Sequence, residues 1–166
     1  KKGEFERAKL LVSAGVDLLV LDVAHGHMQK TIETTKKLKQ MFGEKVGIVS
    51  GNVVTYKAAK DLFMAGTDSV KVGIGPGSTC ITRIETGCGV PQISAILDCA
   101  KAARTYKKTL ICDGGMKNSG DVVKALAAGA SAVMTGHLFA GLAETAGKII
   151  IKNGKKYKEY NGSTSL

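Results

Sequence analysis

A cysteine in a glycine-rich loop is the feature of this sequence best suited to covalent chemistry. The loop, residues 73–83, reads GIGPGSTCITR and follows a short apolar run, so we expect it to begin where a strand ends. Its glycines let the backbone approach a ligand closely. A thiolate is a strong nucleophile toward an electron-poor ring carbon. Because a polar glycine-rich loop is a poor place for a buried structural thiol, we interpret Cys80 as a nucleophile held beside a bound phosphate or ion.

Two glycine turns further along the chain are suited to binding an anion. Gly114-Gly115 and Gly136 each follow a predicted strand and precede a predicted helix. Free backbone N–H groups at such positions attract negative charge, and a helix N-terminus adds partial positive charge. Asp113 precedes the first turn, and its carboxylate can accept two hydrogen bonds from neighbouring hydroxyls. Capping of a helix N-terminus is the alternative role for Asp113.

Alternating strands and helices must position these residues. Continuous apolar runs indicate strands of a parallel sheet that are buried on both faces, at 16–22, 46–50, 69–73, 109–113 and 132–135. Amphipathic segments between them predict helices at 29–42, 56–65, 94–106, 120–128 and from 138 to 144. Gly15, Gly66 and Gly129 each separate a helix from a strand and can adopt the left-handed conformation that ends a helix. Asn153-Gly154 indicates a hairpin turn.

The candidate residues share one position in this pattern. Asp22, Asn52, the Cys80 loop, Asp113 and Gly136 all follow the carboxyl end of a predicted strand. In (β/α) barrels that end carries the catalytic loops. The shared position favours an enzyme. His25 and His27 lie two residues apart in a loop and are weak metal ligands by their spacing, so we expect a role in loop structure or cofactor contact.

The chain resembles the catalytic barrel of the IMP dehydrogenase/GMP reductase family over essentially its whole length. The resemblance rests on the Cys80 loop and on five further motifs, in the family's order: residues 22–27, 51–55, 89–92, 113–115 and 139–141. It implies an α/β fold, a TIM (β/α)8 barrel of which this chain covers about the last five βα units. A complete barrel needs ~250 residues. We therefore expect a fragment, with a partial catalytic barrel at 1–147 and the start of a flap or tail at 148–166.

The resemblance also implies a role for each candidate residue. Cys80 would attack C2 of a purine nucleotide, Thr82 would handle protons or orient the leaving group, and Glu144 would serve proton delivery. The nucleotide would be bound by Ser78, Asp113, Gly115, Gly136 and Tyr160. The nicotinamide cofactor would lie against Asp22, Asn52 and Gly73. The backbone carbonyls of Gly75, Gly77 and Cys80 would bind potassium. His137 stands where the dehydrogenases usually carry a serine, which leaves one phosphate ligand open.

Two reactions share the covalent intermediate, and the sequence carries signals for both. The tail at 160–165, YNGSTS, and Thr86-Gly87 resemble the reductases, which convert GMP and NADPH to IMP and ammonia. The segments 89–93 and 98–100 resemble bacterial dehydrogenases, which convert IMP and NAD to XMP. We favour the reductase, acting as a homotetramer when full length. A non-catalytic nucleotide-binding or assembly fragment is the alternative from another class.

Composition limits the other partners. The formal net charge is +10, and much of the excess lies between Lys148 and Lys158, which we interpret as a solvated basic face. With no Trp and only four Phe and four Tyr, a stacking platform for nucleic acid is disfavoured. No apolar run is long enough to span a membrane. The four cysteines form no zinc-type pair; Cys99 and Cys112 lie in apolar stretches and are predicted core residues. These features favour a cytoplasmic protein.

Overall fold

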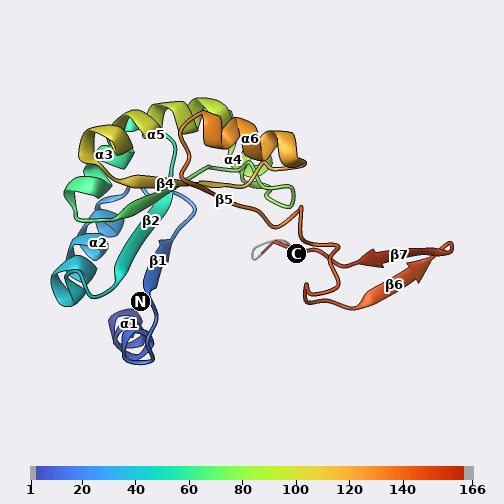
Figure 1. Cartoon of the computed structure of the whole chain (residues 1–166), viewed down its shortest axis with the longest axis horizontal. Coiled ribbons are helices and arrows are strands. Elements are labelled where there is room, and N and C mark those ends of the chain that lie inside the picture. Colours follow the sequence, from blue (N-terminus) through green and yellow to red (C-terminus); the bar gives the residue numbers. More distant parts are fainter. Residues whose placement is uncertain (1–2, 163–166) are drawn as a thin grey trace.

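Five parallel strands form the centre of the molecule. The computed structural model describes residues 3–162 and places the strands side by side in the order of the sequence (Figure 1). They are β1 (Leu18–Asp22), β2 (Gly47–Val53), β3 (Ser69–Val72), β4 (Thr109–Asp113) and β5 (Ala132–Met134). A consecutive order requires each connection to cross over in the same sense, as in a (β/α) barrel. All five predicted strands are therefore present, with bounds that shift by up to three residues.

Helices cover one face of this sheet. They are α2 (Gln29–Phe42), α3 (Tyr56–Met64), α5 (Gln92–Tyr106) and α6 (Ser119–Ala127), and α1 (Glu4–Ser13) precedes β1 (Figure 1). The main core lies between the sheet and α3 and α5, where Leu62, Ile96 and Leu110 are fully buried. Cys99 and Cys112 are fully buried there too, as predicted. In the described residues no helix is long and apolar enough to cross a membrane.

Glycine and polar caps set the ends of these helices. Gly15, Gly66 and Gly129 all have positive φ angles, of 90°, 100° and 114°, so each ends a helix as predicted. Thr55 and Asn118 begin α3 and α6, because each side chain accepts a hydrogen bond from a backbone N–H of the first turn. Local signals in the sequence therefore set the ends of these helices.

The strand β1 differs from its prediction. A strand buried on both faces was expected, yet only Leu19 of this strand is buried, while Leu18 and Val20 are each 47% exposed. The reason is its position at the edge of the sheet, with helices against one face only. The strand β5 forms the other edge. Both edges offer unpaired backbone groups.

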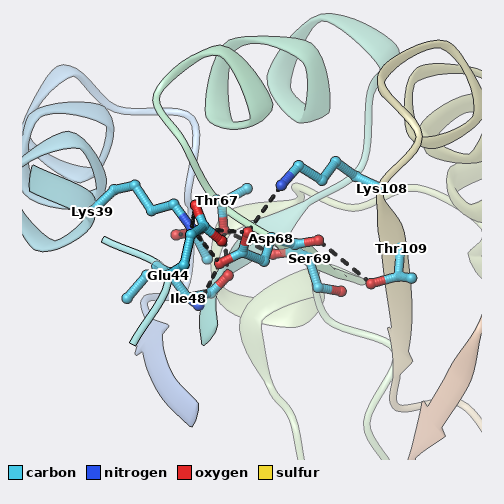
Figure 2. A network of polar contacts seen from close by, with 9 residues as sticks. Lys39, Glu44, Ile48, Thr67, Asp68, Ser69, Lys108 and Thr109 are labelled. Atoms are coloured by element: carbon cyan, nitrogen blue, oxygen red, sulfur yellow. Dashed lines mark hydrogen bonds and ion pairs between the residues drawn. The ribbon is translucent and has the colours of Figure 1, made fainter. Parts of the chain in front are cut away.

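A polar network ties strands together at the amino ends of the sheet. Asp68 accepts hydrogen bonds from the Lys39 and Lys108 ammonium groups, at 3.2 and 2.9 Å, and from the Ile48 N–H at 3.0 Å (Figure 2). Lys39 also pairs with Glu44. The network thus joins α2, β2 and the segments that precede β3 and β4, at the end of the sheet opposite the candidate site.

The segment after β5 is the main error in the predicted fold. Instead of a helix from 138 to 144, the chain makes successive short turns, with hydrogen bonds between residues three apart, such as Leu142 N–H to Phe139 O at 3.0 Å. Phe139 and Leu142 are about half exposed, so the apolar contact that would stabilise an amphipathic helix is missing. Beyond it, β6 (Ile149–Lys152) and β7 (Lys155–Lys158) form the hairpin predicted at Asn153-Gly154, which projects from the sheet (Figure 1).

Candidate active site

The Cys80 loop leaves the carboxyl end of β3. Cys80 is exposed, and its thiol donates a hydrogen bond to the Thr82 hydroxyl at 3.1 Å. Thr82 begins the short helix α4 (Thr82–Thr86), which the sequence did not predict. The backbone N–H of Cys80 donates to the Gly77 carbonyl at 3.1 Å, which folds the loop into a tight turn. The structure therefore presents a thiol and a hydroxyl together on an exposed turn.

Arg83 holds the two ends of this loop together. Its guanidinium donates to the Ile74 carbonyl at 3.2 Å and to the Val90 carbonyl at 2.7 Å. Two glycines make room for the side chain, because a Cβ on Gly75 or Gly89 would lie 2.6 or 2.5 Å from an atom of Arg83. Such a Cβ contact would force a shift of the loop. The two glycines therefore leave space for the Arg83 side chain, besides allowing the backbone its conformation.

The other exposed thiol, Cys88, lies just beyond α4, while the two remaining thiols are inert by burial. Burial, together with the Asp98 charge, raises the pKa of Cys99 to about 12. Burial also raises the pKa of Cys112, against a hydrogen bond from Gln92. A cysteine acts as a nucleophile in its deprotonated thiolate form. Cys80 and Cys88 are therefore the thiols of this chain that a reagent can reach.

A small cavity of about 40 Å³ lies beside the Cys80 loop. It is lined by Pro76, Gly77, Ser78, Gly114, Gly115, Met116, Lys117, Thr135, Gly136, His137 and Tyr160. The loops after β3, β4 and β5 thus meet at one point, and four residues expected to bind the nucleotide (Ser78, Gly115, Gly136 and Tyr160) share this lining. The lining combines glycine backbone, three hydroxyl side chains and one lysine, and these groups suit an anion.

Tyr160 closes this cavity against Gly136. A Cβ on Gly136 would collide with the Tyr160 hydroxyl and would lie 3.2 Å from Cζ of its ring, so a larger residue there would require the tyrosine to move. The imidazole of His137 lies with its centroid 6.3 Å from that of the Tyr160 ring. His137 therefore lines the cavity at the position where a serine was expected.

The predicted contribution of helix N-termini to this cavity is only partly correct. No helix follows Gly136 directly, since the chain makes turns there. The helix α6 begins at Ser119, four residues after Gly115, and its first N–H groups are capped by Asn118. The attraction for an anion therefore comes mainly from loop N–H groups and Lys117. Glu144, the predicted proton donor, is exposed in the turns after β5 and lies outside the cavity lining.

Asp113 lies at the end of β4 within a polar cluster. Its Oδ2 atom is bound by the Lys71 ammonium and accepts a hydrogen bond from the Asn52 side-chain N–H at 2.9 Å. It does not cap a helix, because Asn118 has that role. Its side chain is 24% exposed, and no described group is bound to Oδ1. That oxygen is left for a ligand.

The residues predicted for the cofactor adjoin this cluster. Asp22 is 65% exposed and pairs with Lys71 at 3.1 Å, so part of its carboxylate faces the solvent. The Asn52 side chain donates to the Gly73 carbonyl at 2.7 Å, and its Oδ1 is buried without a partner among the described residues. An orphaned acceptor and an open carboxylate fit the amide and hydroxyl groups of a nicotinamide nucleotide. Gly73 packs tightly against its neighbours, because a Cβ there would collide with the Asp113 carbonyl oxygen and would also meet the Gln92 amide.

Two further predictions concern the histidines and a potassium ion. His27 pairs with Asp61 at 2.9 Å, which ties the loop after β1 to α3. Hydrogen bonds from Lys57 and from His27 lower the pKa of Asp61. The described residues contain no cluster of metal-binding side chains. Gly75, Gly77 and Cys80 do lie on one loop, but the Gly77 carbonyl already accepts a hydrogen bond from Cys80.

A comparison with known proteins identifies the family that carries this site. A model of the IMP dehydrogenase / GMP reductase domain matches residues 1–166. The chain belongs to the IMP dehydrogenase / GMP reductase family. As a member it is 52% identical over 164 residues to inosine-5′-monophosphate dehydrogenase of Rhodopirellula baltica, and 56% identical over 160 residues to that of Staphylococcus aureus. These matches cover 99% and 96% of this chain but 30% and 33% of the relatives, so the chain spans about a third of their length.

Solved structures of the family share the fold. GMP reductase from Trypanosoma brucei, crystallised with guanosine 5′-monophosphate, has a TM-score of 0.90 and 46% identity to this family member. The match covers 95% of this chain and 33% of that chain; a second structure of the enzyme matches 98% and 36% at 45% identity. The expected fold class, α/β with the consecutive βα units of a TIM barrel, is thereby confirmed.

Sequence reasoning missed three residues that shape the site of this family member. Lys71, Arg83 and Gln92 all act within the polar cluster or the Cys80 loop. Gln92 donates to the Val72 carbonyl at 2.9 Å and to the Asp113 carbonyl at 3.2 Å, which joins β3 to β4. A lysine between two valines of a buried strand was the available signal, since a lysine is almost never fully buried unless paired. Nothing comparable marked Gln92, which begins an ordinary helix.

Proposed function

We propose that the protein is a purine nucleotide oxidoreductase that reacts at C2 through a covalent bond to Cys80. One observation carries this proposal: a single loop supplies both the exposed thiol and part of the anion cavity. Ser78, which lines the cavity, stands two residues before Cys80. A nucleotide phosphate held in the cavity would bring its base toward the neighbouring polar cluster, within range of the sulfur. Proximity of this kind is a large part of enzymatic rate enhancement.

The first chemical step belongs to Cys80. Its thiol loses a proton and the sulfur adds to C2 of GMP; the C2 amino group takes up that proton and leaves as ammonia, which gives a thioimidate on the enzyme. Thr82 accepts the thiol hydrogen bond, so its hydroxyl lies where a proton can pass between sulfur and the leaving amine. NADPH, when bound, supplies the hydride that reduces C2. The C2–S bond then breaks, Cys80 is restored as thiolate, and IMP is released.

The ribose and the phosphate would be held by different groups. The free Oδ1 of Asp113 would accept a hydrogen bond from a ribose hydroxyl, while Ser78, Gly115, Gly136 and Tyr160, which line the cavity, would surround the phosphate. Asp22 and Asn52 would contact the nicotinamide half of the cofactor. The carbonyls of the Cys80 loop would bind potassium, and the full-length protein would be a homotetramer.

The direction of the reaction rests on the tail. Residues 160–165 favour GMP reductase, but residues 163–166 lie outside the described part of the chain, so this support is from sequence alone. IMP dehydrogenase, which would oxidise IMP with NAD to XMP, is the second candidate. The identities of 52% and 56% to proteins named inosine-5′-monophosphate dehydrogenase favour it.

Two paired assays test the proposal on the full-length protein. We expect GMP with NADPH to yield IMP and ammonia, and IMP with NAD to yield little XMP. Rapid NADH formation from IMP would reverse the direction while keeping the family of reactions. Absence of turnover with either pair, together with absence of nucleotide binding, would contradict the proposed function. The Cys80→Ala variant provides the blank for both assays.

A further inference from the structure

Lys71 is a buried charge without a role in the chemistry described above. Its side chain is 3% exposed, although it lies in the middle of β3 between two fully buried valines. The ammonium pairs with two carboxylates, Asp113 and Asp22, the latter at 3.1 Å. A buried lysine that lost one of these partners would be strongly unfavourable. Both carboxylates are therefore needed to keep this buried ammonium charged.

The sheet is built so that this lysine can link carboxylates on β1 and β4, across four neighbouring strands. In the strand register Asp22 of β1 is opposite Gly51 of β2, and Gly51 is opposite Lys71 of β3. Gly51 has no side chain between the two, and a Cβ there would lie 2.6 Å from the Lys71 carbonyl oxygen and 2.7 Å from its Cβ. The glycine leaves the path across β2 open. Lys71 thus reaches Asp22 across one strand and Asp113 on the strand at its other side.

The two carboxylates serve different ligands in the proposed function, on which the following inference rests. Asp113 faces the nucleotide ribose, while Asp22 faces the nicotinamide cofactor. Lys71 and Asn52 occupy Oδ2 of Asp113, so they fix the direction of Oδ1. One ammonium therefore holds both carboxylates. A ligand that restricts the motion of one carboxylate also restricts the ammonium that binds the other.

We propose that Lys71 is a positioning residue that couples nucleotide binding to cofactor binding. A ligand on Asp22 restrains the ammonium, and the ammonium then presents Asp113 already ordered to the nucleotide. Binding of one ligand thus lowers the ordering entropy that the other must lose. The coupling is reciprocal by thermodynamic linkage, so each ligand tightens the other by the same factor. That factor is expected to be about fivefold or more.

Calorimetry on the full-length protein tests this inference. The affinity for GMP is measured with and without NADP, and the affinity for IMP with and without NADH, which are pairs that do not react, for the wild type and for Lys71→Met, Lys71→Arg and Asp22→Asn. Lys71→Met should weaken nucleotide binding about tenfold or more and abolish the coupling. Lys71→Arg should restore most of both, because a guanidinium can also bridge two carboxylates. Asp22→Asn should keep most of the nucleotide affinity and lose the coupling.

Lys108→Met is the matched control. Lys108 also pairs with a carboxylate, Asp68 at 2.9 Å, but at the opposite end of the sheet. It should lower thermal stability and leave nucleotide affinity and coupling unchanged. If Lys71→Met does not fold, Lys71→Arg and Asp22→Asn decide the question. Coupling in Asp22→Asn within twofold of the wild type overturns the role of Lys71, whereas a wild type that binds neither nucleotide contradicts the proposed function itself.

Discussion

The thiol of Cys80 and the hydroxyl of Thr82 lie 3.1 Å apart, and Thr82 is the first residue of the helix α4. The helix fixes the position of the Thr82 hydroxyl. The turn that is closed by the hydrogen bond from the Cys80 N–H to the Gly77 carbonyl fixes the position of the sulfur. Both side chains come from one stretch of three residues, so their geometry depends little on the rest of the barrel.

Cys80→Ala in the full-length protein should abolish turnover while nucleotide binding persists, because positioning alone cannot replace a covalent step. Thr82→Val should lower kcat ~100-fold or more, since general acid–base catalysis contributes at least that much, with a smaller effect on the nucleotide dissociation constant. Cys88→Ala, which removes the other exposed thiol, is the control and should keep wild-type kinetics. A Cys80→Ala variant that retains a tenth of the wild-type rate would refute the covalent mechanism.

The phosphate cavity is tested by one glycine. Gly136→Ala would drive a methyl group into the Tyr160 ring, displacing it from the cavity, so affinity for GMP should fall ~10-fold or more, equivalent to the ~1–3 kcal/mol of unmatched hydrogen-bonding partners. The matched control is Gly141→Ala in the same segment, where an added Cβ meets nothing within 4 Å. Titration of both variants with GMP and with guanosine separates the phosphate from the rest of the ligand. Equal affinities of the two variants for GMP would mean that the phosphate lies elsewhere.

Asp68 should make stability depend on pH at the amino end of the sheet. Burial, the largest single influence on this carboxyl, opposes its ionisation, but hydrogen bonds from Lys108, the Ile48 N–H and Lys39 together lower its pKa below the ordinary 3.8. A lowered folded pKa gives stability that is present above the unfolded pKa and is lost as the pH falls through the folded pKa.

The variant Asp68→Asn should therefore melt at a lower temperature than the wild type near neutral pH, and the difference should shrink below about pH 4. Asp17→Asn, at an exposed position before β1, is the control and should follow the wild type throughout. A melting difference between Asp68→Asn and the wild type that is the same at neutral and at acid pH would show that the network acts through packing and not through charge.

The strands and helices could be predicted well from the sequence, because apolar runs and the glycines that end helices are local signals. Both α2 and β4 have the predicted bounds, and Gly15, Gly66 and Gly129 end helices as expected. The helix α1 was missed, although Phe5, Ala8 and Val12 follow a helical period. The helix expected after β5 was wrong because Phe139 and Leu142 stay about half exposed. Leu138 does pack against the core, but periodicity alone does not show which residues will find such a partner.

The site was predictable at the level of loops and not at the level of side-chain contacts. That the loops after β3, β4 and β5 meet follows from the parallel order of strands, which a sequence pattern reveals. The bridge from Lys71 to Asp22 depends on the register that places Gly51 between them. Register between distant strands is a tertiary property, so residues such as Lys71 and Gln92 emerge only from the structure.

The central claim is that Cys80 forms the bond to the purine, and peptide mapping of a quenched reaction tests it most directly. The full-length protein is mixed with GMP and NADPH, or with IMP and NAD, quenched in acid during the first turnover and digested with trypsin. Cleavage after Lys71 and Arg83 yields residues 72–83, a peptide in which Cys80 is the sole cysteine. We predict a nucleotide adduct on that peptide and none in Cys80→Ala. An adduct on a peptide that carries Cys88, Cys99 or Cys112 instead, or turnover with no adduct at any quench time, would contradict the account.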